Sequence, residues 1–231
     1  MIQKATHLFI LIHLLYSCAH ETYSHQELSS RSEPGEWESL FGGKVANLST
    51  LNGNRPDPQN WRIEGGLLKA IPGRKADLRS LKMFKNFEMI FEFAIEAGSN
   101  SGVKYLINPV LKNVGPEYQI IDEALHPDGS MGPKRHTSAV YDLFPSTASN
   151  RRPLGEFNMG KIVVKGLDVE HWLNDELSIR YNIASNEFKA ARLKSKFSGV
   201  LDFATHSPSY VLIQHHGEEV AFRSIKIRRL P

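Results

Sequence analysis

One segment points most directly to the fold class: Phe87-Glu88-Met89-Ile90-Phe91-Glu92-Phe93-Ala94-Ile95. Successive side chains of a β-strand point to opposite faces of its sheet. The segment therefore places Phe87, Met89, Phe91 and Phe93 on one side, as a strand that covers a hydrophobic core does. This period of two predicts a β-strand rather than a helix.

Similar short segments follow along the chain, separated by turn signals such as Asn174-Asp175 and His216-Gly217-Glu218. We expect strands at Ser101–Ile107, Glu117–Ile121, Lys161–Lys165, Val169–Leu173, Tyr210–Gln214 and Val220–Ile227. Many short strands at this spacing predict an all-β sandwich or jelly roll. Only Asn186–Lys196 has a helical composition, with Ser185 as its expected N-cap.

The N-terminal region has the pattern of an export signal. Lys4 precedes a short apolar run, which is too short to span a bilayer as a mature helix. The run ends at Leu15-Tyr16-Ser17-Cys18, which resembles a bacterial lipoprotein box, and Cys18 is the only cysteine. We therefore expect a signal peptide at 1–18, lipidation at Cys18, and an exported protein in the periplasm or anchored at the outer membrane. Ordinary signal-peptidase cleavage nearby is the alternative.

The rest of the chain divides into a tether and one domain. Residues 19–35 are polar and lack periodicity, so we expect a flexible tether there. Residues 36–231 are enough for one β-sandwich domain with a sizeable core. The net charge of +3 is small, and no basic stripe interleaved with aromatic residues indicates nucleic-acid binding. We expect membrane contact only through the N-terminal lipid.

The expected strand Glu117–Ile121 carries polar side chains in an unusual place. Glu117 and Gln119 share one face, and Asp122 follows where the strand ends. A carboxylate and a carboxamide side by side indicate the polar floor of a concave site. A long irregular stretch follows directly, from Glu123 to about Glu156. Because a loop this long in a compact domain is usually functional or disordered, we expect a rim or lid over the strand.

Several short motifs occur in a fixed order. They are Trp61-Arg62-Ile63-Glu64-Gly65-Gly66-Leu67-Leu68, Asn100-Ser101-Gly102, Glu117-Tyr118-Gln119-Ile120-Ile121-Asp122 and Phe222-Arg223-Ser224-Ile225. Together they resemble the 3-keto-disaccharide hydrolase domain family, from about Trp37 to Leu230. The resemblance implies a concanavalin-like jelly roll with a sugar groove, and a 3-keto-glycoside as substrate.

Such a substrate defines the chemistry that the site must perform. A ketone at C3 acidifies the C2–H bond, and removal of that proton gives an enolate that expels the C1 substituent; water can then add back. We expect Glu117 or His171 as the base, with Glu117 preferred. Many family members have an arginine where this chain has Leu106. Lys104, two residues earlier on the same face, would then be the cation beside the enolate.

The remaining candidate residues are polar or aromatic. Hydrogen bonds to the sugar are expected from Asn100, Gln119, Asp122, Asn158 and Gln214. Tyr141 or Trp172 would stack on a sugar face. A divalent metal ion is the alternative to Lys104 for holding the enolate, with Glu117, Asp122 and His126 as candidate ligands.

Structural interpretations stand beside these assignments. Glu117 could simply pair with Lys104, and His171 shares its parity with apolar neighbours, as a hydrogen-bonded core histidine does. His215 and His216 alternate in direction, so at most one lines the site. The first functional hypothesis is an enzyme that uses sugars oxidised by a sugar 3-dehydrogenase. The second is a non-catalytic carbohydrate-binding lipoprotein, because a sandwich fold serves both classes.

Overall fold

The computed structural model describes residues 35–231 except 109 and 112. The predicted signal peptide at 1–18, Cys18 and all but the last residue of the tether at 19–35 lie outside the described residues. Within the described part of the chain, no helix is both long and apolar enough to cross a membrane.

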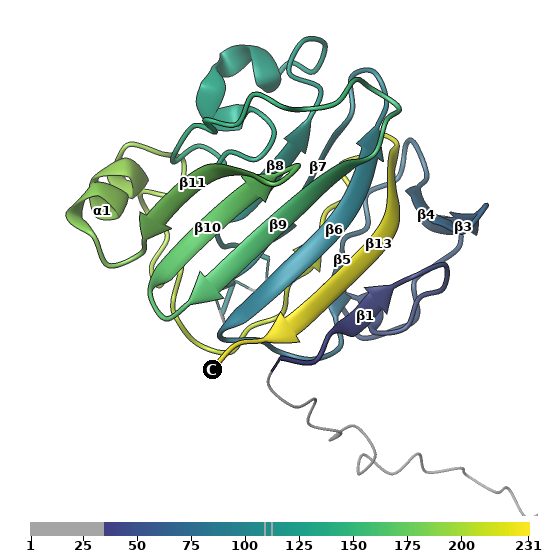
Figure 1. Ribbon diagram of the computed structural model, residues 1–231, viewed down its shortest axis with the longest axis horizontal. Coiled ribbons are helices and arrows are strands. Elements are labelled where there is room, and N and C mark those ends of the chain that lie inside the picture. Colours follow the sequence, from purple (N-terminus) through teal and green to yellow (C-terminus); the bar gives the residue numbers. More distant parts are fainter. Residues whose placement is uncertain (1–34, 109, 112) are drawn as a thin grey trace, which may run out of the picture. The chain divides into compact units, whose positions relative to one another are not determined.

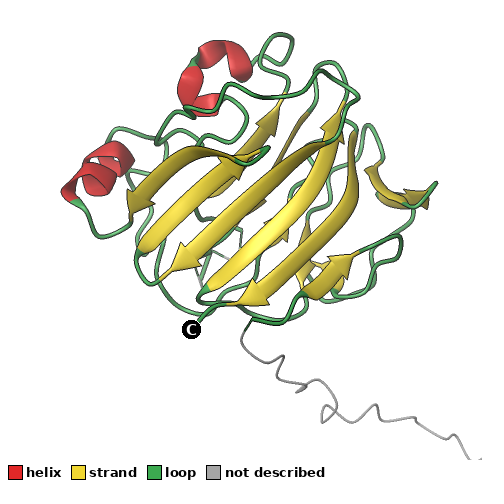
Figure 2. Cartoon of the chain, in the orientation of Figure 1, coloured by secondary structure: helices red, strands yellow, loops and turns green. Residues whose placement is uncertain are grey.

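The domain consists of two antiparallel β-sheets packed face to face (Figures 1 and 2). The eight-stranded sheet has the order β11 (Glu176–Asn182), β10 (Asp168–Leu173), β9 (Asn158–Lys165), β6 (Phe87–Ile95), β13 (Val220–Arg229), β4 (Leu67–Ala70) and β3 (Trp61–Glu64), with β1 (Glu38–Phe41) paired to β13. The five-stranded sheet has the order β2 (Leu48–Thr50), β5 (Leu78–Ser80), β12 (Leu212–Ile213), β7 (Asn100–Lys104) and β8 (Glu117–Ile121). The described chain has one α-helix, α1 (Asn186–Leu193). The predicted all-β sandwich with one short helix is confirmed.

The core lies between the sheets and follows the alternation of β6. Phe87, Met89, Phe91 and Phe93 are almost fully buried. Phe91 meets Tyr118 of the other sheet edge to face, with ring centroids 5.1 Å apart. Such aromatic pairs add stability beyond the burial of their area.

Strand β8 is buried on both of its faces. Tyr118 and Ile120 point into the core. The chain that follows β8 folds back and runs along this strand. Two backbone hydrogen bonds join them: Tyr141 N donates to Glu117 O (3.0 Å), and Ser138 N donates to Gln119 O (2.8 Å). The predicted rim over this strand is therefore present, and it includes the 3₁₀ turns η1 (Gly129–Met131) and η2 (Pro133–Arg135).

Several elements differ from the sequence prediction. The strand expected over Ser101–Ile107 ends at Lys104, because the backbone turns at Leu106, which has a φ of 44°. The helix ends at Leu193 rather than at Lys196, although Ser185 caps it as expected, with Oγ accepting a hydrogen bond from Phe188 N (3.0 Å). Strand β11 was not predicted, because buried and exposed residues do not alternate regularly along it.

Replacing Phe91 by alanine tests the core. We expect a loss of about 3–5 kcal/mol in the free energy of unfolding, since the substitution removes a fully buried ring and leaves a cavity. Ile90→Ala is the matched control, because Ile90 lies on the opposite, partly exposed face of β6. Denaturant titration of both variants measures the difference, and equal losses would contradict this account of the core.

Candidate functional site

A polar cluster occupies the outer face of the five-stranded sheet, the face that points away from the core. Lys104 of β7 lies opposite Glu117 of β8, and Gly102 lies opposite Gln119. Gln214 follows β12, and its backbone N–H donates to Gly102 O (2.9 Å). Directly opposed residues of neighbouring strands share a face. The fold thus brings together Lys104, Glu117, Gln119 and Gln214, here called the Glu117 cluster.

The Glu117 carboxylate is the centre of this cluster. Gln119 and Gln214 each donate a side-chain N–H to Oε1, at 3.0 and 2.9 Å, in the amide orientations that satisfy all their neighbours. Lys104 Nζ lies 3.8 Å from Oε2 and donates to the Gln214 side-chain oxygen (3.0 Å). Only 5% of Glu117 is exposed. Charge-assisted hydrogen bonds of this kind hold a buried carboxylate in a defined position.

Gly102 provides the space in which these side chains meet. A Cβ atom at this position would collide with the Gln214 amide and would lie 2.9 Å from Glu117 Oε1. The absence of a side chain at Gly102 therefore permits the contact between Glu117 and Gln214 across strand β7.

A second set of charged groups approaches from the chain segments outside the sheet. Lys196 follows helix α1, and its Nζ lies 4.0 Å from the centroid of the Tyr141 ring. The Tyr141 hydroxyl donates to Asp128 Oδ2 (2.7 Å) and accepts from Arg135 (2.9 Å). Lys196 N also donates to Asp142 Oδ2 (2.8 Å). These contacts fix Lys196 and Tyr141 beside the cluster.

The electrostatics of Glu117 and Lys196 are coupled. Burial raises the pKa of Glu117, while Lys104 and Lys196 act in the opposite direction. Burial lowers the pKa of Lys196, while Glu117 opposes this shift. The pKa of Glu117 is thus raised and that of Lys196 lowered by burial, and shifts in these directions are typical of catalytic bases and acids.

His216 joins the site through Gln214. Its Nε2 donates to the Gln214 side-chain oxygen (2.8 Å), which leaves Nδ1 as an acceptor. Burial lowers the pKa of His216. The adjacent His215 faces elsewhere and packs edge to face against Trp61, with centroids 5.2 Å apart.

Asn100 and Asp122 lie at the other end of the same strand pair. Asn100 shares its face with Gly102 and Lys104, and its side-chain oxygen is buried with no hydrogen-bond partner among the described residues. An unpaired buried acceptor costs free energy, so a ligand that donates to it would bind favourably. Both Asp122 oxygens are occupied, because they accept from the backbone of Gly98 (2.8 Å) and Ala124 (3.1 Å).

His171 does not reach this face. It lies in the interior on β10, fully buried, with Nε2 hydrogen-bonded to the Tyr105 hydroxyl (2.5 Å) and Nδ1 to Ser138 O (3.0 Å). Burial lowers its pKa to about 4. The interpretation as a hydrogen-bonded core histidine describes its environment. Because both ring nitrogens are engaged inside the core, this position does not support the alternative assignment of His171 as the base.

Asn158 and Trp172 belong to the eight-stranded sheet and not to the cluster. Asn158 Oδ1 accepts from Arg152 N (2.8 Å) and from the Asn174 amide (2.9 Å), which fastens a loop. Trp172 alternates with the inward-facing His171, and its ring lies 4.1 Å from Lys161 Nζ. The structure thus separates both residues from Glu117.

The residues expected to bind a metal ion do not converge. The part of the chain that the structure describes contains no group of three or more His, Cys, Asp or Glu side chains placed to hold one. His126 Nδ1 accepts from Asp128 N (3.0 Å) and so shapes a turn. The three candidates Glu117, Asp122 and His126 therefore do not fit a shared metal site.

Three residues near the cluster were missed from the sequence: Lys196, Asp128 and Arg135. Lys196 was expected only as the end of the helix, because nothing local marks its contact with Tyr141. Of the three residues, Asp128 could have been suspected from the sequence, because it lies in the long irregular stretch that follows β8.

Comparison with known proteins identifies the family. Residues 36–228 match the model of the 3-keto-alpha-glucoside-1,2-lyase-like domain. The chain belongs to this family. A 3-keto-disaccharide hydrolase from Bacteroides thetaiotaomicron is 32% identical to this family member over 224 residues. The match covers 83% of this chain and 77% of the relative.

Solved structures agree with this assignment. A candidate glycosyl hydrolase from Parabacteroides distasonis superposes on this 3-keto-glucoside lyase-like domain with a TM-score of 0.75, at 28% identity, over 84% of this chain and 94% of its own. The laminarinase catalytic domain from Thermotoga maritima shares the fold alone, with a TM-score of 0.50 and 10% identity over 85% of this chain and 98% of its own. The predicted concanavalin-like jelly roll is thereby confirmed.

The raised pKa of Glu117 predicts how stability changes with pH. In the folded protein Glu117 binds its proton more tightly than in the unfolded chain. Stability therefore falls as the pH rises from the ordinary pKa of a glutamate through the raised value. We expect the stability of Glu117→Gln relative to the wild type to increase over this window.

Thermal unfolding of both proteins at several pH values from about 4 to 8 checks this expectation. Glu92→Gln is the control, because Glu92 is partly exposed and pairs with Arg223 on the outer side of the other sheet. A constant difference between Glu117→Gln and wild type would contradict the raised pKa.

Proposed function

We propose that the protein cleaves 3-keto-glycosides and that Glu117 is the base that starts the reaction. The family membership and the named relatives support a glycoside-cleaving enzyme. One observation carries the finer proposal: a buried carboxylate with a raised pKa lies between two amides and near two lysines. A carbohydrate-binding protein needs amides and aromatic rings but no base with a tuned pKa.

The proposed reaction is an elimination. Glu117 takes the proton from C2 of the sugar, and the electrons of the C2–H bond form an enolate with the C3 carbonyl. The enolate then re-forms the ketone as a C1–C2 double bond develops, and the C1–O bond breaks with its electron pair on the leaving oxygen. Addition of water across the double bond, with hydroxide at C1 and a proton at C2, completes a net hydrolysis.

Two lysines provide the positive charge that this sequence needs. Lys104, hydrogen-bonded to Gln214, would stabilise the negative charge that develops on the C3 oxygen. Lys196 has a lowered pKa and would give a proton to the leaving oxygen. Asn100 would accept a hydrogen bond from a sugar hydroxyl through its unpaired oxygen.

The first test compares 3-keto-glucosides with their unoxidised parents. We expect cleavage of the keto compounds only, because the unoxidised sugar has no acidic C2–H bond. Glu117→Gln should lower kcat by roughly 10²–10⁴-fold, the usual contribution of a general base. Glu92→Gln should retain wild-type activity.

Full activity of Glu117→Gln would show that another group takes the proton, and His216 would be the next candidate. Binding of both compounds without cleavage of either would support the alternative of a non-catalytic carbohydrate-binding protein.

A second test concerns the lysine that sequence reasoning missed. Because Lys196 lowers the pKa of Glu117, Lys196→Met should raise this pKa and shift the acidic limb of the kcat/KM profile to higher pH. Lys196→Arg keeps the positive charge and should leave the limb near its wild-type position. If the acidic limb of the kcat/KM profile of Lys196→Met stays at its wild-type pH, Lys196 does not lower the pKa of the catalytic base.

The cellular setting is part of the proposal. Export and lipidation at Cys18 would place the enzyme at the cell envelope, and they rest on the sequence pattern alone. The substrate must be formed by oxidation of the C3 hydroxyl, so a sugar 3-dehydrogenase is the class of enzyme that would supply it.

A further inference from the structure

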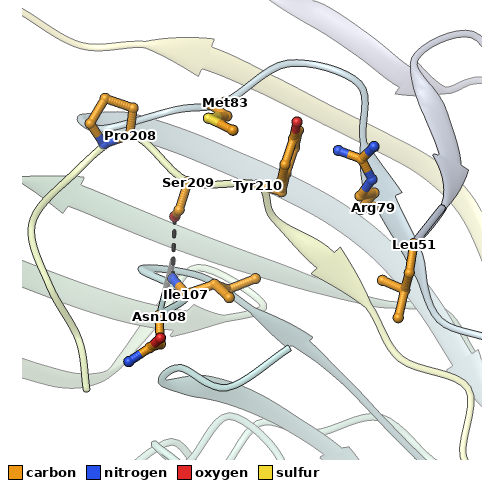
Figure 3. Close-up of a pocket in the computed structure, with 8 residues that line it drawn as sticks. All are labelled: Leu51, Arg79, Met83, Ile107, Asn108, Pro208, Ser209 and Tyr210. Carbon is orange, nitrogen blue, oxygen red and sulfur yellow. Dashed lines mark hydrogen bonds between the residues drawn. The ribbon is translucent and has the colours of Figure 1, made fainter. Parts of the chain in front are cut away.

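A separate hollow lies on the five-stranded sheet (Figure 3). Its volume is about 330 Å³, within the usual range for small-molecule sites. Its walls combine apolar side chains with an arginine and a tyrosine: Leu51, Arg79, Met83, Ile107, Asn108, Pro208, Ser209 and Tyr210. None of these residues belongs to the Glu117 cluster.

Strand register places this hollow and the cluster on the same face of the sheet, with the fully buried Leu212 between them. Arg79 of β5 lies opposite Leu212 of β12, Leu212 lies opposite Lys104, and Lys104 lies opposite Glu117. Directly opposed side chains share a face, so Arg79 and Glu117 are the two ends of one row on the outer face. Arg79 and Glu117 are separated by three strand spacings. At about 5 Å for each spacing, their backbones lie about 15 Å apart.

The hollow is built around a tyrosine ring with an arginine on one side. The Arg79 guanidinium carbon lies 3.9 Å from the Tyr210 ring centroid. Figure 3 shows Arg79 on one side of Tyr210, and Met83, Ser209 and Ile107 on the other. The Tyr210 ring lines the hollow, so a sugar that enters it would meet an aromatic surface.

Arg79 retains hydrogen-bonding capacity. It donates through Nε to Thr50 O at 3.4 Å, and no carboxylate among the described residues lies within ion-pair distance of it. A guanidinium has five N–H donors, so most of them remain for a ligand. By contrast, Asn108 is occupied, since its Oδ1 accepts from Val110 N and Leu111 N.

We propose that this hollow, the Tyr210 subsite, binds a sugar ring of the substrate other than the ring that reacts at Glu117. The ring stacks on Tyr210, and Arg79 donates to its hydroxyl oxygens. The inference rests on the proposed function, because the occupied ring is part of the same glycoside. The separation of about 15 Å implies an oligosaccharide substrate rather than a glycoside with a small leaving group.

The first experiment measures kcat/KM for a series of 3-keto-oligosaccharides of increasing length and for methyl 3-keto-glucoside. In the wild type, kcat/KM should rise once the chain is long enough to reach Tyr210. Tyr210→Ala should lose this rise, about tenfold for one aromatic contact, and should leave the methyl glycoside unchanged. Tyr210→Phe keeps the ring and should behave like the wild type.

Equal losses of kcat/KM for all lengths, or no loss for any, would overturn the subsite. If the wild type cleaves none of these compounds, the proposed reaction is contradicted. The Tyr210 subsite is then tested on its own by measuring the binding of unoxidised oligosaccharides with calorimetry. Weaker binding by Tyr210→Ala than by Tyr210→Phe would then support it, and equal or undetectable binding by both would overturn it.

Discussion

The candidate site depends on one physical constraint, the burial of the Glu117 carboxylate on the outer face of β8. A buried charge is costly unless hydrogen bonds and opposite charges compensate for it. The two glutamine amides and Lys104 provide that compensation, and the missing side chain at Gly102 lets them approach. The compensation is incomplete, because the pKa of Glu117 is raised, and a raised pKa suits a base that must take a proton from carbon.

The sandwich core holds this carboxylate in place from behind. Tyr118, the neighbour of Glu117, points inward, packs against Phe91 and donates its hydroxyl to Trp172 O (3.0 Å). Next to it, the Tyr105 hydroxyl lies between His171 (2.5 Å) and Tyr181 (2.7 Å) in a buried network that links the two sheets. Satisfied networks of this kind rigidify a core. His171 is therefore important for the site through packing, although it does not line it.

The features most reliably predicted from the sequence are those set by the alternation of side chains along a strand. The alternation of Phe87–Ile95 and the shared face of Glu117 and Gln119 both follow from a period of two. The same parity placed His171 beside apolar neighbours, and the structure puts it in the core with both ring nitrogens engaged. That position favours the core interpretation over the alternative role of His171 as a base. Parity within one strand does not show which sheet the strand joins, so Asn158 and Trp172 were grouped with residues from which the structure separates them.

Contacts between distant segments could not be predicted in this way. Lys196 reaches Tyr141 only because the turn after helix α1 is fastened to Asp142. No local pattern encodes that hydrogen bond, since its partners are 54 residues apart. The Tyr210 subsite likewise requires the register of β5, β12 and β7, and a single sequence does not give the pairing of strands so far apart.

The central claim is that Glu117 removes a proton from C2 of a 3-keto sugar. The most direct measurement is the kinetic isotope effect on kcat/KM for a 3-keto-glucoside that carries deuterium at C2. The account predicts slower cleavage of the deuterated substrate by the wild type and loss of cleavage in Glu117→Gln. Equal rates for both substrates, together with activity retained in Glu117→Gln, would contradict it.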